Sequence, residues 1–588
     1  MNLHAVILEH EIENFGLTKD GKAFAKSMLS QAWDVDYLIH INGLLNVLVL
    51  KNENGKDAIW YFDETKKFIG NSINNIKIHN DKKNFFFKIV FFKFINSIKQ
   101  KNNKIYQSLS RKGYFFSELL LACDYLNSEL TTNTKEVDPD VYEILFQDGR
   151  CMQDKCIASE TADHHISVNL DGEIYTSSHG IVINISSLAY PLWSKSGDLC
   201  LIIEGGHRGA WYILFMEKTQ KVYYTKQASL LFSGPFHPIK ALINHLIDFG
   251  VQIENYMNQS SKPKKYGIVG GNAHIGHSLW NYVSAIQRIS DKKIANNLNE
   301  IIVVNGENSE PWISVEEIIE DYNGIVNRKL NHKAVAEYVY QVNSFPIRLT
   351  DDYIKANSIE KIISKAKSRC SQITNRTNNE LRVVLGLRVE NRTWTNQADG
   401  LVQIAKFLAQ RFENLTLIID GHDLITTTGK VYRSALESND HGVVEIEKKL
   451  VFNVQNALKE TNVRVIDAVA MSLECSIAWI ISSDFFIAPW GAGLAKYKWV
   501  ANLPGVVFTS KLNMQYKGER YLYENPQIRE DATSCIYVDE LYLTDEEDTP
   551  SLVSVPGVKS GHSRANFYVD PKGIDIAIEK VLTQIGRA

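Results

Sequence analysis

The chain has 588 residues and a mass of 66.8 kDa, a length typical of three or four domains rather than one small module. Apolar residues make up 44% and charged residues 22%, a composition that excludes a disordered or collagen-like chain. The net charge of -4 excludes the strongly basic balance of a general nucleic-acid binder, so we expect no nucleic-acid partner.

The sequence carries no sign of a membrane span or a secretory signal. No run of 18 or more apolar residues occurs, and Glu9 and Glu11 stand where a signal peptide would be basic and then apolar. The seven cysteines are few and odd in number, which favours reduced thiols over a disulfide framework. We therefore expect a cytoplasmic protein.

Residues 1–135 are predicted to form an α+β accessory region. Two apolar runs flank Asn54-Gly55, the dipeptide most typical of a tight hairpin. Residues 82–104 place phenylalanines at helical spacing among lysines, which predicts a basic amphipathic helix that contacts the inner membrane surface peripherally. The alternative is that the phenylalanine face packs on the rest of the domain.

Residues 136–257 are predicted to be a second, β-rich accessory region. Apolar and polar residues alternate on both sides of Asp171-Gly172, and two further apolar runs flank a glycine-rich turn after Cys200. The polar segment 258–267, with one proline and several lysines, has the composition of a linker. We place the main domain boundary there.

From residue 262 onward, strands and helices alternate, which predicts an α/β fold with doubly wound parallel sheets. The first half, 262–375, begins with a βαβ pattern and ends in a long helical stretch from about 330 to 372. The second half, 376–588, has apolar strands separated by amphipathic helices. Its predicted strands are 382–387, 415–421, 463–468 and 505–510, and the core residues of its last helix are Ile574, Ile576, Ile578 and Val581.

Two motifs in these halves resemble glycosyltransferase family 61 and related capsular polysaccharide glycosyltransferases of the GT-B fold. The first is Gly276-His277-Ser278-Leu279, and the second is the stretch 484–494 followed by Pro504-Gly505. The resemblance covers roughly residues 262–588 and implies a pair of Rossmann-type domains, an acceptor half at 262–375 and a donor half at 376–588. The sequence departs from the family pattern at Trp490, Lys496, Tyr497 and Ser510.

The glycine turn after a buried strand is the candidate phosphate site. Transfer of a sugar from a nucleotide-sugar donor releases a phosphate or diphosphate anion, whose charge must be stabilised. Backbone N–H groups in such a turn, at the start of a helix, can approach a phosphate closely. The alternative is a tight turn with no ligand. The residues placed for this role are Gly491, Ala492, Gly493 and Leu494.

Positive charge for the same phosphates is predicted from Arg388 and Arg392, which follow a strand at the edge where open α/β sheets bind ligands. Arginine suits phosphate because its planar fork binds two oxygens. The alternative is surface arginines paired with Glu390. Lys496 is a further donor-binding candidate, with a solvated helix residue as its alternative.

His277 is the first candidate for the catalytic base and His274 the second, since an imidazole titrates near neutral pH and can accept a hydroxyl proton. The alternative is that one of the two merely caps the helix. Asp420 and His422 follow the next strand and are candidates for contact with the ribose or the base of the donor.

Together these features predict a glycosyltransferase that moves a sugar from a nucleotide-sugar donor to a glycan or glycolipid acceptor. The family resemblance further implies an inverting enzyme that needs no metal or other cofactor and builds a bacterial surface polysaccharide, such as capsule or lipopolysaccharide. The alternative is a non-catalytic carbohydrate-binding or assembly subunit on a degenerate GT-B fold. Trp490 in place of the family's histidine keeps this alternative open.

Overall fold

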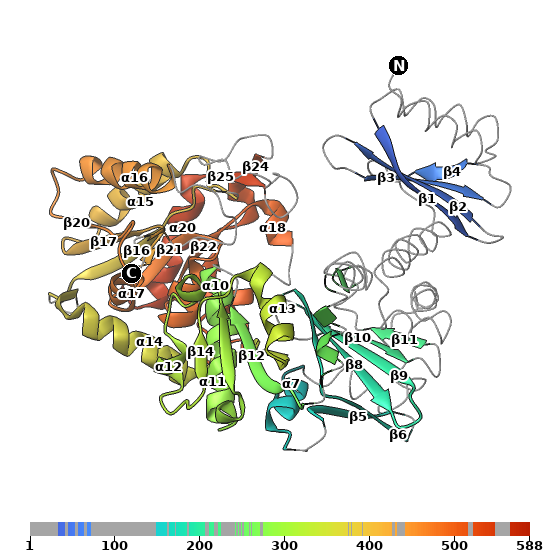
Figure 1. Ribbon diagram of the computed structural model, residues 1–588. Coiled ribbons are helices and arrows are strands. Elements are labelled where there is room, and N and C mark those ends of the chain that lie inside the picture. The colour runs from blue at the N-terminus through green and yellow to red at the C-terminus, as the bar shows by residue number, and fades with distance from the viewer. Residues whose placement is uncertain are drawn as a thin grey trace. The chain divides into compact units, whose positions relative to one another are not determined.

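A computed structural model describes four strands between residues 33 and 71, and residues 149–588 with gaps (Figure 1). The larger gaps are 206–210, 217–220, 225–240, 426–429, 432–441, 516–520 and 547–564. The chain divides into two compact units, the first containing residues 1–129, 219–222 and 239–254 and the second containing the rest. The helix predicted at 82–104 lies outside the described residues.

The first unit contains a four-stranded antiparallel sheet in the order β1-β2-β3-β4. Its strands are β1 (Trp33–Ile41), β2 (Leu45–Asn52), β3 (Asp57–Asp63) and β4 (Phe68–Asn71). Strands β2 and β3 pair antiparallel on the two sides of Asn54-Gly55, which confirms the predicted hairpin.

The predicted β-rich region forms a seven-stranded sheet in the order β11-β10-β9-β8-β6-β5, with β7 paired to β8. Helix α7 (Gly149–Ala158) precedes it. The strands are β5 (Ile166–Leu170), β6 (Glu173–Ser177), β7 (Ile181–Asn184), β8 (Ser187–Ser194), β9 (Leu199–Gly205), β10 (Trp211–Met216) and β11 (Lys221–Tyr224). Strand β8 is almost wholly buried, and the Tyr190 hydroxyl donates to the backbone oxygen of Pro346, which ties this sheet to the α/β part.

The first parallel sheet has four strands in the order β14-β13-β12-β15. They are β12 (Lys264–Gly270), β13 (Glu300–Val304), β14 (Ile325–Asn327) and β15 (Ser344–Arg348). A continuous helix connects β12 to β13, as the βαβ pattern predicts. It comprises α10 (Ile275–His277), the π-helical η1 (Ser278–Val283) and α11 (Ser284–Asp291), and the later helices are α12 (Val315–Ile318), α13 (His332–Gln341) and α14 (Ala356–Arg369).

The long helical stretch predicted from 330 to 372 is wrong in its middle. Strand β15 separates α13 from α14 and pairs in parallel with β12. Asn343 has a φ of 52°, which ends the helix, and Pro346 lacks the N–H group that a helix interior needs. All five β15 residues are buried, and this burial stabilises the strand.

The second parallel sheet has six strands in the order β20-β17-β16-β21-β22-β23. They are β16 (Leu381–Gly386), β17 (Leu415–Asp420), β20 (Arg464–Asp467), β21 (Phe485–Pro489), β22 (Gly505–Phe508) and β23 (Cys535–Tyr537). The predicted strands all occur. Short antiparallel pairs accompany this sheet: β18 (Leu424–Ile425) with β19 (Lys430–Val431), and β24 (Leu543–Glu546) with β25 (Asn566–Val569).

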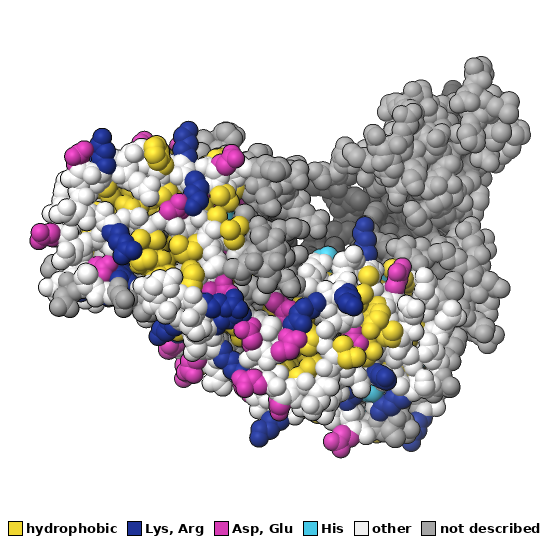
Figure 2. Space-filling view, turned by 60° about the vertical axis from the view of Figure 1, so that its left-hand side comes forward, with side chains coloured by type: hydrophobic (Ala, Val, Ile, Leu, Met, Phe, Trp, Pro, Cys, Tyr) yellow, Lys and Arg dark blue, Asp and Glu magenta, His cyan; other side chains and the backbone are white. Residues whose placement is uncertain are grey.

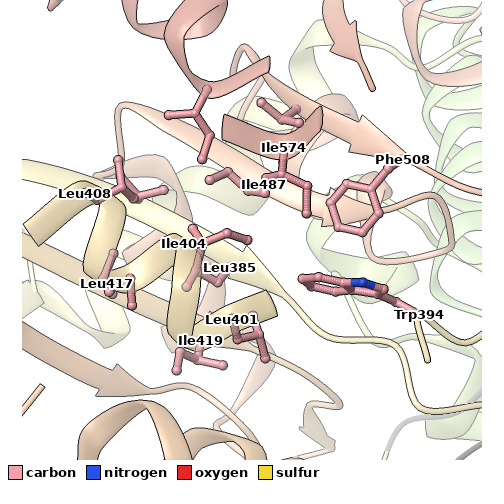
Figure 3. Packing of buried hydrophobic residues seen from close by; sticks show 14 of the residues in the cluster. Leu385, Trp394, Leu401, Ile404, Leu408, Leu417, Ile419, Ile487, Phe508 and Ile574 are labelled. Carbon is pink, nitrogen blue, oxygen red and sulfur yellow. The ribbon is translucent and has the colours of Figure 1, made fainter. Parts of the chain in front are cut away.

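Helices cover both faces of the six-stranded sheet (Figure 1). Helices α15, α16 and α20 share one core with the strands, and α17 contacts β17 from the other side. Figure 3 shows Leu401 and Ile404 of α15 near Leu385 of β16, and Trp394 facing Phe508. These helices are α15 (Gln397–Ala409), α16 (Val443–Ala457), α17 (Leu473–Ile481) and α20 (Pro571–Gln584), with α18 (Lys511–Gln515) nearby in sequence.

Helix α20 packs as predicted with one exception. Ile574, Ile578 and Val581 are buried, whereas Ile576 is 36% exposed. The helical period explains this, because a residue two places after Ile574 lies on the far side of the helix. The predicted core position at 576 is therefore wrong.

The expectation of reduced thiols is also wrong for one pair. Cys370 at the end of α14 and Cys475 in the first turn of α17 form a disulfide, with a Cα–Cα distance of 5.5 Å. They are 105 residues apart in sequence, so only the packing of α14 on α17 brings them together. Among the described residues, Cys156, Cys200 and Cys535 are free thiols.

Within the part of the chain that the structure describes, no helix combines the length and the apolar character needed to cross a membrane.

Gly400 inside α15 gives a test of the core. Alanine is favoured over glycine in a helix by about 1 kcal/mol, but a Cβ at Gly400 would collide with the buried indole of Trp394. We expect Gly400→Ala to lower the free energy of unfolding by roughly 1–3 kcal/mol in urea denaturation, because a packed core resists added volume. A stabilised variant would contradict this placement of Trp394.

Candidate active site

Both parallel sheets reverse their direction of strand addition once. In the four-stranded sheet the chain adds β13 and β14 on one side of β12 and then returns to its other side with β15. In the six-stranded sheet it adds β17 and β20 on one side of β16 and then returns with β21. Ligands in open α/β sheets bind at such switch points, beyond the carboxyl ends of the strands. The predicted site residues follow β12, β16, β17 and β21.

The two histidines predicted as bases begin the helix after β12. His274 is its N-cap residue, and Nδ1 of His274 accepts a hydrogen bond from the His277 backbone N–H at 3.3 Å. His274 therefore does the capping work that the sequence left as an alternative. The His277 ring lies 5.0 Å from the His274 ring and is partly exposed.

Asn281, one turn after His277, orients the His277 ring. The Asn281 side-chain amide donates through Nδ2 to the Asp351 backbone oxygen at 2.7 Å, so its Oδ1 is the atom that faces His277 Nδ1 at 2.9 Å. Because Oδ1 only accepts, His277 Nδ1 carries the hydrogen in the neutral ring. This leaves Nε2 as the basic nitrogen of His277.

The guanidinium of Arg388 lies against the glycine turn after β21. A Cβ added at Gly491 would collide with Nη1 of Arg388, so Arg388 occupies the space that only a glycine leaves open. Among the described residues, none accepts a hydrogen bond from the backbone N–H groups of Gly491, Ala492 or Gly493. Leu494 N–H donates to the Gly491 oxygen at 3.1 Å and closes the turn.

Arg388 is partly buried beside the glycine turn. Burial lowers its pKa, and nearby Glu390 and Tyr523 act in the opposite direction. Its backbone N–H donates to the Gln397 side chain at 2.9 Å, which fixes the loop after β16. Guanidinium groups stay charged even when their pKa is lowered, so the positive charge beside Gly491 is permanent.

Arg392 lies beside the same turn. Its backbone has a φ of 57°, and its guanidinium lies over the Trp490 ring at 4.8 Å from the ring centre. Trp490 is 7% exposed, and its indole Nε1 has no hydrogen-bond partner among the described residues. Hydrogen-bond donors therefore lie together at one edge of the sheet, namely those of Arg388, Arg392, the Trp490 indole and the turn amides.

Lys496, expected to be a donor-binding or a solvated residue, is buried with carboxylates. Its ammonium lies 2.7 Å from Asp420 and 2.9 Å from Asp423, and all three side chains are at most 3% exposed. Tyr497 donates to Asp420 Oδ2 at 2.5 Å, and Ser476 donates to Oδ1 at 2.8 Å. Asp420 is therefore engaged inside the protein by both Lys496 and Tyr497.

The charge balance of this buried cluster is uneven, with two carboxylates for one ammonium. Burial alone would lower the pKa of Lys496, but Asp420 and Asp423 raise it above its usual value. Burial raises the pKa of Asp423 to about 6, although Lys496 opposes the rise. Asp423 Oδ1 has no hydrogen-bond partner among the described residues. The cluster thus holds one carboxyl that protonates easily.

His422 lies between two carboxylates at the end of β17. Its Nδ1 lies 2.8 Å from Glu447 Oε1, and its backbone N–H donates to Glu447 Oε2 at 3.0 Å. Glu390 lies 3.9 Å from Nε2 on the other side. Glu447 is fully buried, so it fixes the orientation of the His422 ring.

An aromatic cluster brings the His277 helix and the glycine turn together. A Cβ at Gly276 would meet Trp499 at 3.7 Å, and Trp280 lies 5.6 Å from Trp499 between ring centres. Trp499 belongs to η5 (Ala495–Val500), the helix directly after the glycine turn. The two switch points are thus adjacent within the second unit.

Sequence reasoning missed several residues of this site. Asn281 had a usable signal, because it stands four residues after His277 on one helix face. Asp423 had a weaker one, as a second carboxylate in the turn after Asp420. Glu447 and Tyr523 had none, since only the tertiary packing places them beside the loops after β16 and β17.

The exposed surface gives no single-sign field on the face shown in Figure 2, where basic and acidic side chains alternate around apolar patches. Among the described residues, no group of three or more His, Cys, Asp or Glu side chains is arranged to hold a metal ion.

No protein-family model matches the chain, and no curated protein matches its sequence. It is similar to a solved structure of Escherichia coli ADP-heptose lps heptosyltransferase II, with 10% identity, a TM-score of 0.26, and 55% of this chain and 99% of that chain covered.

Two further solved structures are weakly similar. One is described as a UDP-N-acetylglucosamine 2-epimerase from Listeria monocytogenes, with 9% identity, a TM-score of 0.19, and 38% of this chain and 62% of that chain covered. The other is a complex of S. aureus MnaA with UDP, with 10% identity, a TM-score of 0.18, and 55% and 98% covered. All three TM-scores are low, so these likenesses carry no conclusion about this chain.

The titration of Asp423 predicts a pH-dependent stability. The folded-state pKa near 6 exceeds the usual value of 3.8, so this group stabilises the fold at low pH and loses that contribution as the pH rises through 6. In the wild-type protein, we expect the free energy of unfolding to fall by roughly 1–3 kcal/mol between pH 4 and 7, measured by urea denaturation. In Asp423→Asn this fall should be absent.

Asp420→Asn is the comparison variant. It removes the carboxylate shared by Lys496, Tyr497 and Ser476, and we expect a loss of about 3–5 kcal/mol at pH 7. An unchanged pH profile in Asp423→Asn would contradict the assigned cluster.

Gly491→Ala tests whether the Arg388 guanidinium lies against Gly491. The added methyl displaces the guanidinium, so we expect affinity for inorganic pyrophosphate to fall roughly tenfold or more in titration calorimetry, as for loss of a charge-assisted contact. Because Gly491→Ala acts through Arg388, adding it to Arg388→Ala is expected to cause little further loss. Fully additive losses would contradict this geometry.

Proposed function

We propose that this protein is a glycosyltransferase that moves a sugar from a nucleotide-sugar donor to a glycan or glycolipid acceptor. The proposal extends to a metal-independent, inverting enzyme of the GT-B type, related to family 61, that builds a bacterial surface polysaccharide. The observation that carries it is the position of the Arg388 guanidinium against Gly491 at a switch point, beside three backbone N–H groups for which the described residues provide no acceptor.

The donor set at the glycine turn suits a phosphate leaving group. Arg388 and Arg392 supply charge, and the amides of the adjacent turn supply hydrogen-bond donors. Donors fixed in a buried site stabilise negative charge without reorganising when it develops. The bond from the anomeric carbon to the phosphate oxygen breaks, and the leaving group departs with the electron pair to be held there.

His277 is proposed as the general base. Its Nε2 takes the proton of an acceptor hydroxyl while that oxygen attacks the anomeric carbon from the face opposite the leaving group. Asn281 keeps the hydrogen on Nδ1 and thereby presents Nε2 as the acceptor. A single displacement of this kind inverts the configuration at the anomeric carbon. His274 supports the site as a helix cap.

The nucleoside of the donor is proposed to lie beside His422, whose ring is oriented by Glu447. Asp420 acts indirectly, because its carboxylate is bonded to Lys496 and Tyr497 rather than presented to a ligand. Lys496 accordingly holds the glycine turn in place, through its backbone N–H to the Gly493 oxygen at 3.0 Å and its ammonium to Asp420.

We further propose that the enzyme works at the cytoplasmic face of the inner membrane, held there by residues 82–104. The charge pattern of that segment supports the membrane contact. One observation counts against a cytoplasmic location, namely the Cys370–Cys475 disulfide, since cytosolic disulfides are uncommon. Counting the free thiols of protein taken from intact cells tests the location: a reduced Cys370–Cys475 pair supports a cytoplasmic protein, and an intact disulfide contradicts it.

Nucleotide release from a panel of UDP-, GDP-, dTDP- and CMP-sugars, with and without EDTA, tests the proposed activity. We expect release from one donor that EDTA does not change. Arg388→Ala should weaken donor affinity roughly 10- to 100-fold, and His277→Ala should lower transfer to an acceptor roughly 10²- to 10⁴-fold.

His274→Asn is the matched control for the histidines, because asparagine also caps helices well. Its transfer rate should fall far less than that of His277→Ala. Absence of release from every donor, together with absence of any thermal shift from the nucleotides, would contradict the enzyme and favour the non-catalytic subunit.

A further inference from the structure

Tyr523 lies at the centre of the aromatic cluster that joins the two switch points. Its ring centre is 4.5 Å from that of Trp499 and 5.9 Å from that of Trp490, and the side chain is 5% exposed. On one side Trp490 leads directly into the glycine turn. On the other side Trp499 contacts Trp280, whose ring is stacked with that of His277 at 6.1 Å.

The segment that carries Tyr523 is fastened to three separate elements. Tyr523 lies in η6 (Leu522–Glu524), and Glu524 accepts hydrogen bonds from the Tyr537 hydroxyl at 2.5 Å and the Cys535 N–H at 2.9 Å, both in β23. Further along, Arg529 donates to the backbone oxygens of η5, including that of Trp499.

The same segment also reaches the elements that follow the four-stranded sheet. The backbone N–H of Ile354, just before α14, donates to the oxygen of Ile528 at 2.7 Å. Segment 521–531 is thus held to β23, to η5 and to residue 354 at once. Tyr523 therefore cannot shift independently when a neighbouring side chain moves, because packed interiors are not continuously deformable.

We propose that Tyr523 is a positioning residue that transmits phosphate binding at the glycine turn to the helix carrying His277. The inference rests on the proposed function. Phosphate drawn in by Arg388 and the turn amides presses on Trp490, and the ring of Tyr523 passes this displacement through Trp499 to Trp280. The base is thereby brought to its working distance only when donor phosphate is in place. Misplacement of a catalytic group by about 1 Å costs roughly a hundredfold in rate.

The test uses fluorine NMR of the full chain labelled with 5-fluorotryptophan, with inorganic pyrophosphate as the probe. The chain has 10 tryptophans, and Trp→Phe substitution at 280 and 490 identifies the two resonances that matter. In wild type, pyrophosphate should shift both resonances with one binding curve. In Tyr523→Leu, the Trp490 shift should persist, because Arg388 and the turn remain, while the Trp280 shift is lost.

Two variants control for the fold and the chemistry. Tyr521→Leu changes the neighbouring tyrosine, which is 45% exposed and whose ring packs on that of Tyr537, and it should keep both shifts. Tyr523→Phe keeps the ring and should also keep both. Thermal denaturation of each variant confirms folding.

The outcomes separate the two proposals. A Trp490 shift without a Trp280 shift in wild type, or a Trp280 shift that survives in Tyr523→Leu, overturns the role of Tyr523 alone. If Tyr523→Leu does not fold, a wild-type Trp280 resonance that pyrophosphate leaves unshifted still overturns the role of Tyr523. Absence of any Trp490 shift with pyrophosphate overturns the phosphate site itself, and the role of Tyr523 with it.

Discussion

The ammonium of Lys496, enclosed by Asp420 and Asp423, is the interaction on which the edge of the six-stranded sheet depends. A buried charge of this kind survives only with partners at hydrogen-bond distance, and both carboxylates lie at the end of β17 and in the loop that follows it. Because Lys496 follows the glycine turn and Asp420 ends β17, this ion pair holds the loop after β17 next to the loop after β21. Tyr497 and Ser476 complete the same set of contacts.

The same constraint explains why the site is built mostly of donors. With Asp420 paired to Lys496 inside the protein, the turn at Gly491 lies beside Arg388, Arg392 and backbone amides that have no acceptor among the described residues. A ligand suited to this place carries negative charge. The neighbouring switch point contributes a histidine with an oriented ring, so charge stabilisation and proton transfer lie next to each other.

The sequence allowed the parallel strands to be predicted because each is a short apolar run followed by a turn, as in β16, β17 and β22. It did not allow β15 to be predicted, since the helical pattern on both sides of it concealed a strand defined by Asn343 and Pro346. Loop positions after strands predicted Arg388, His277 and the glycine turn. The partners of Lys496, the cap formed by His274, and Tyr523 depend on contacts between distant segments, which periodicity does not record.

The most direct measurement is a crystal structure of the protein soaked with inorganic pyrophosphate. Our account predicts density within hydrogen-bond distance of the backbone N–H groups of Gly491, Ala492 and Gly493 and of the Arg388 guanidinium. Pyrophosphate bound elsewhere, or an ordered turn that stays without ligand at saturating pyrophosphate, would contradict the assignment of this edge as the donor-phosphate site.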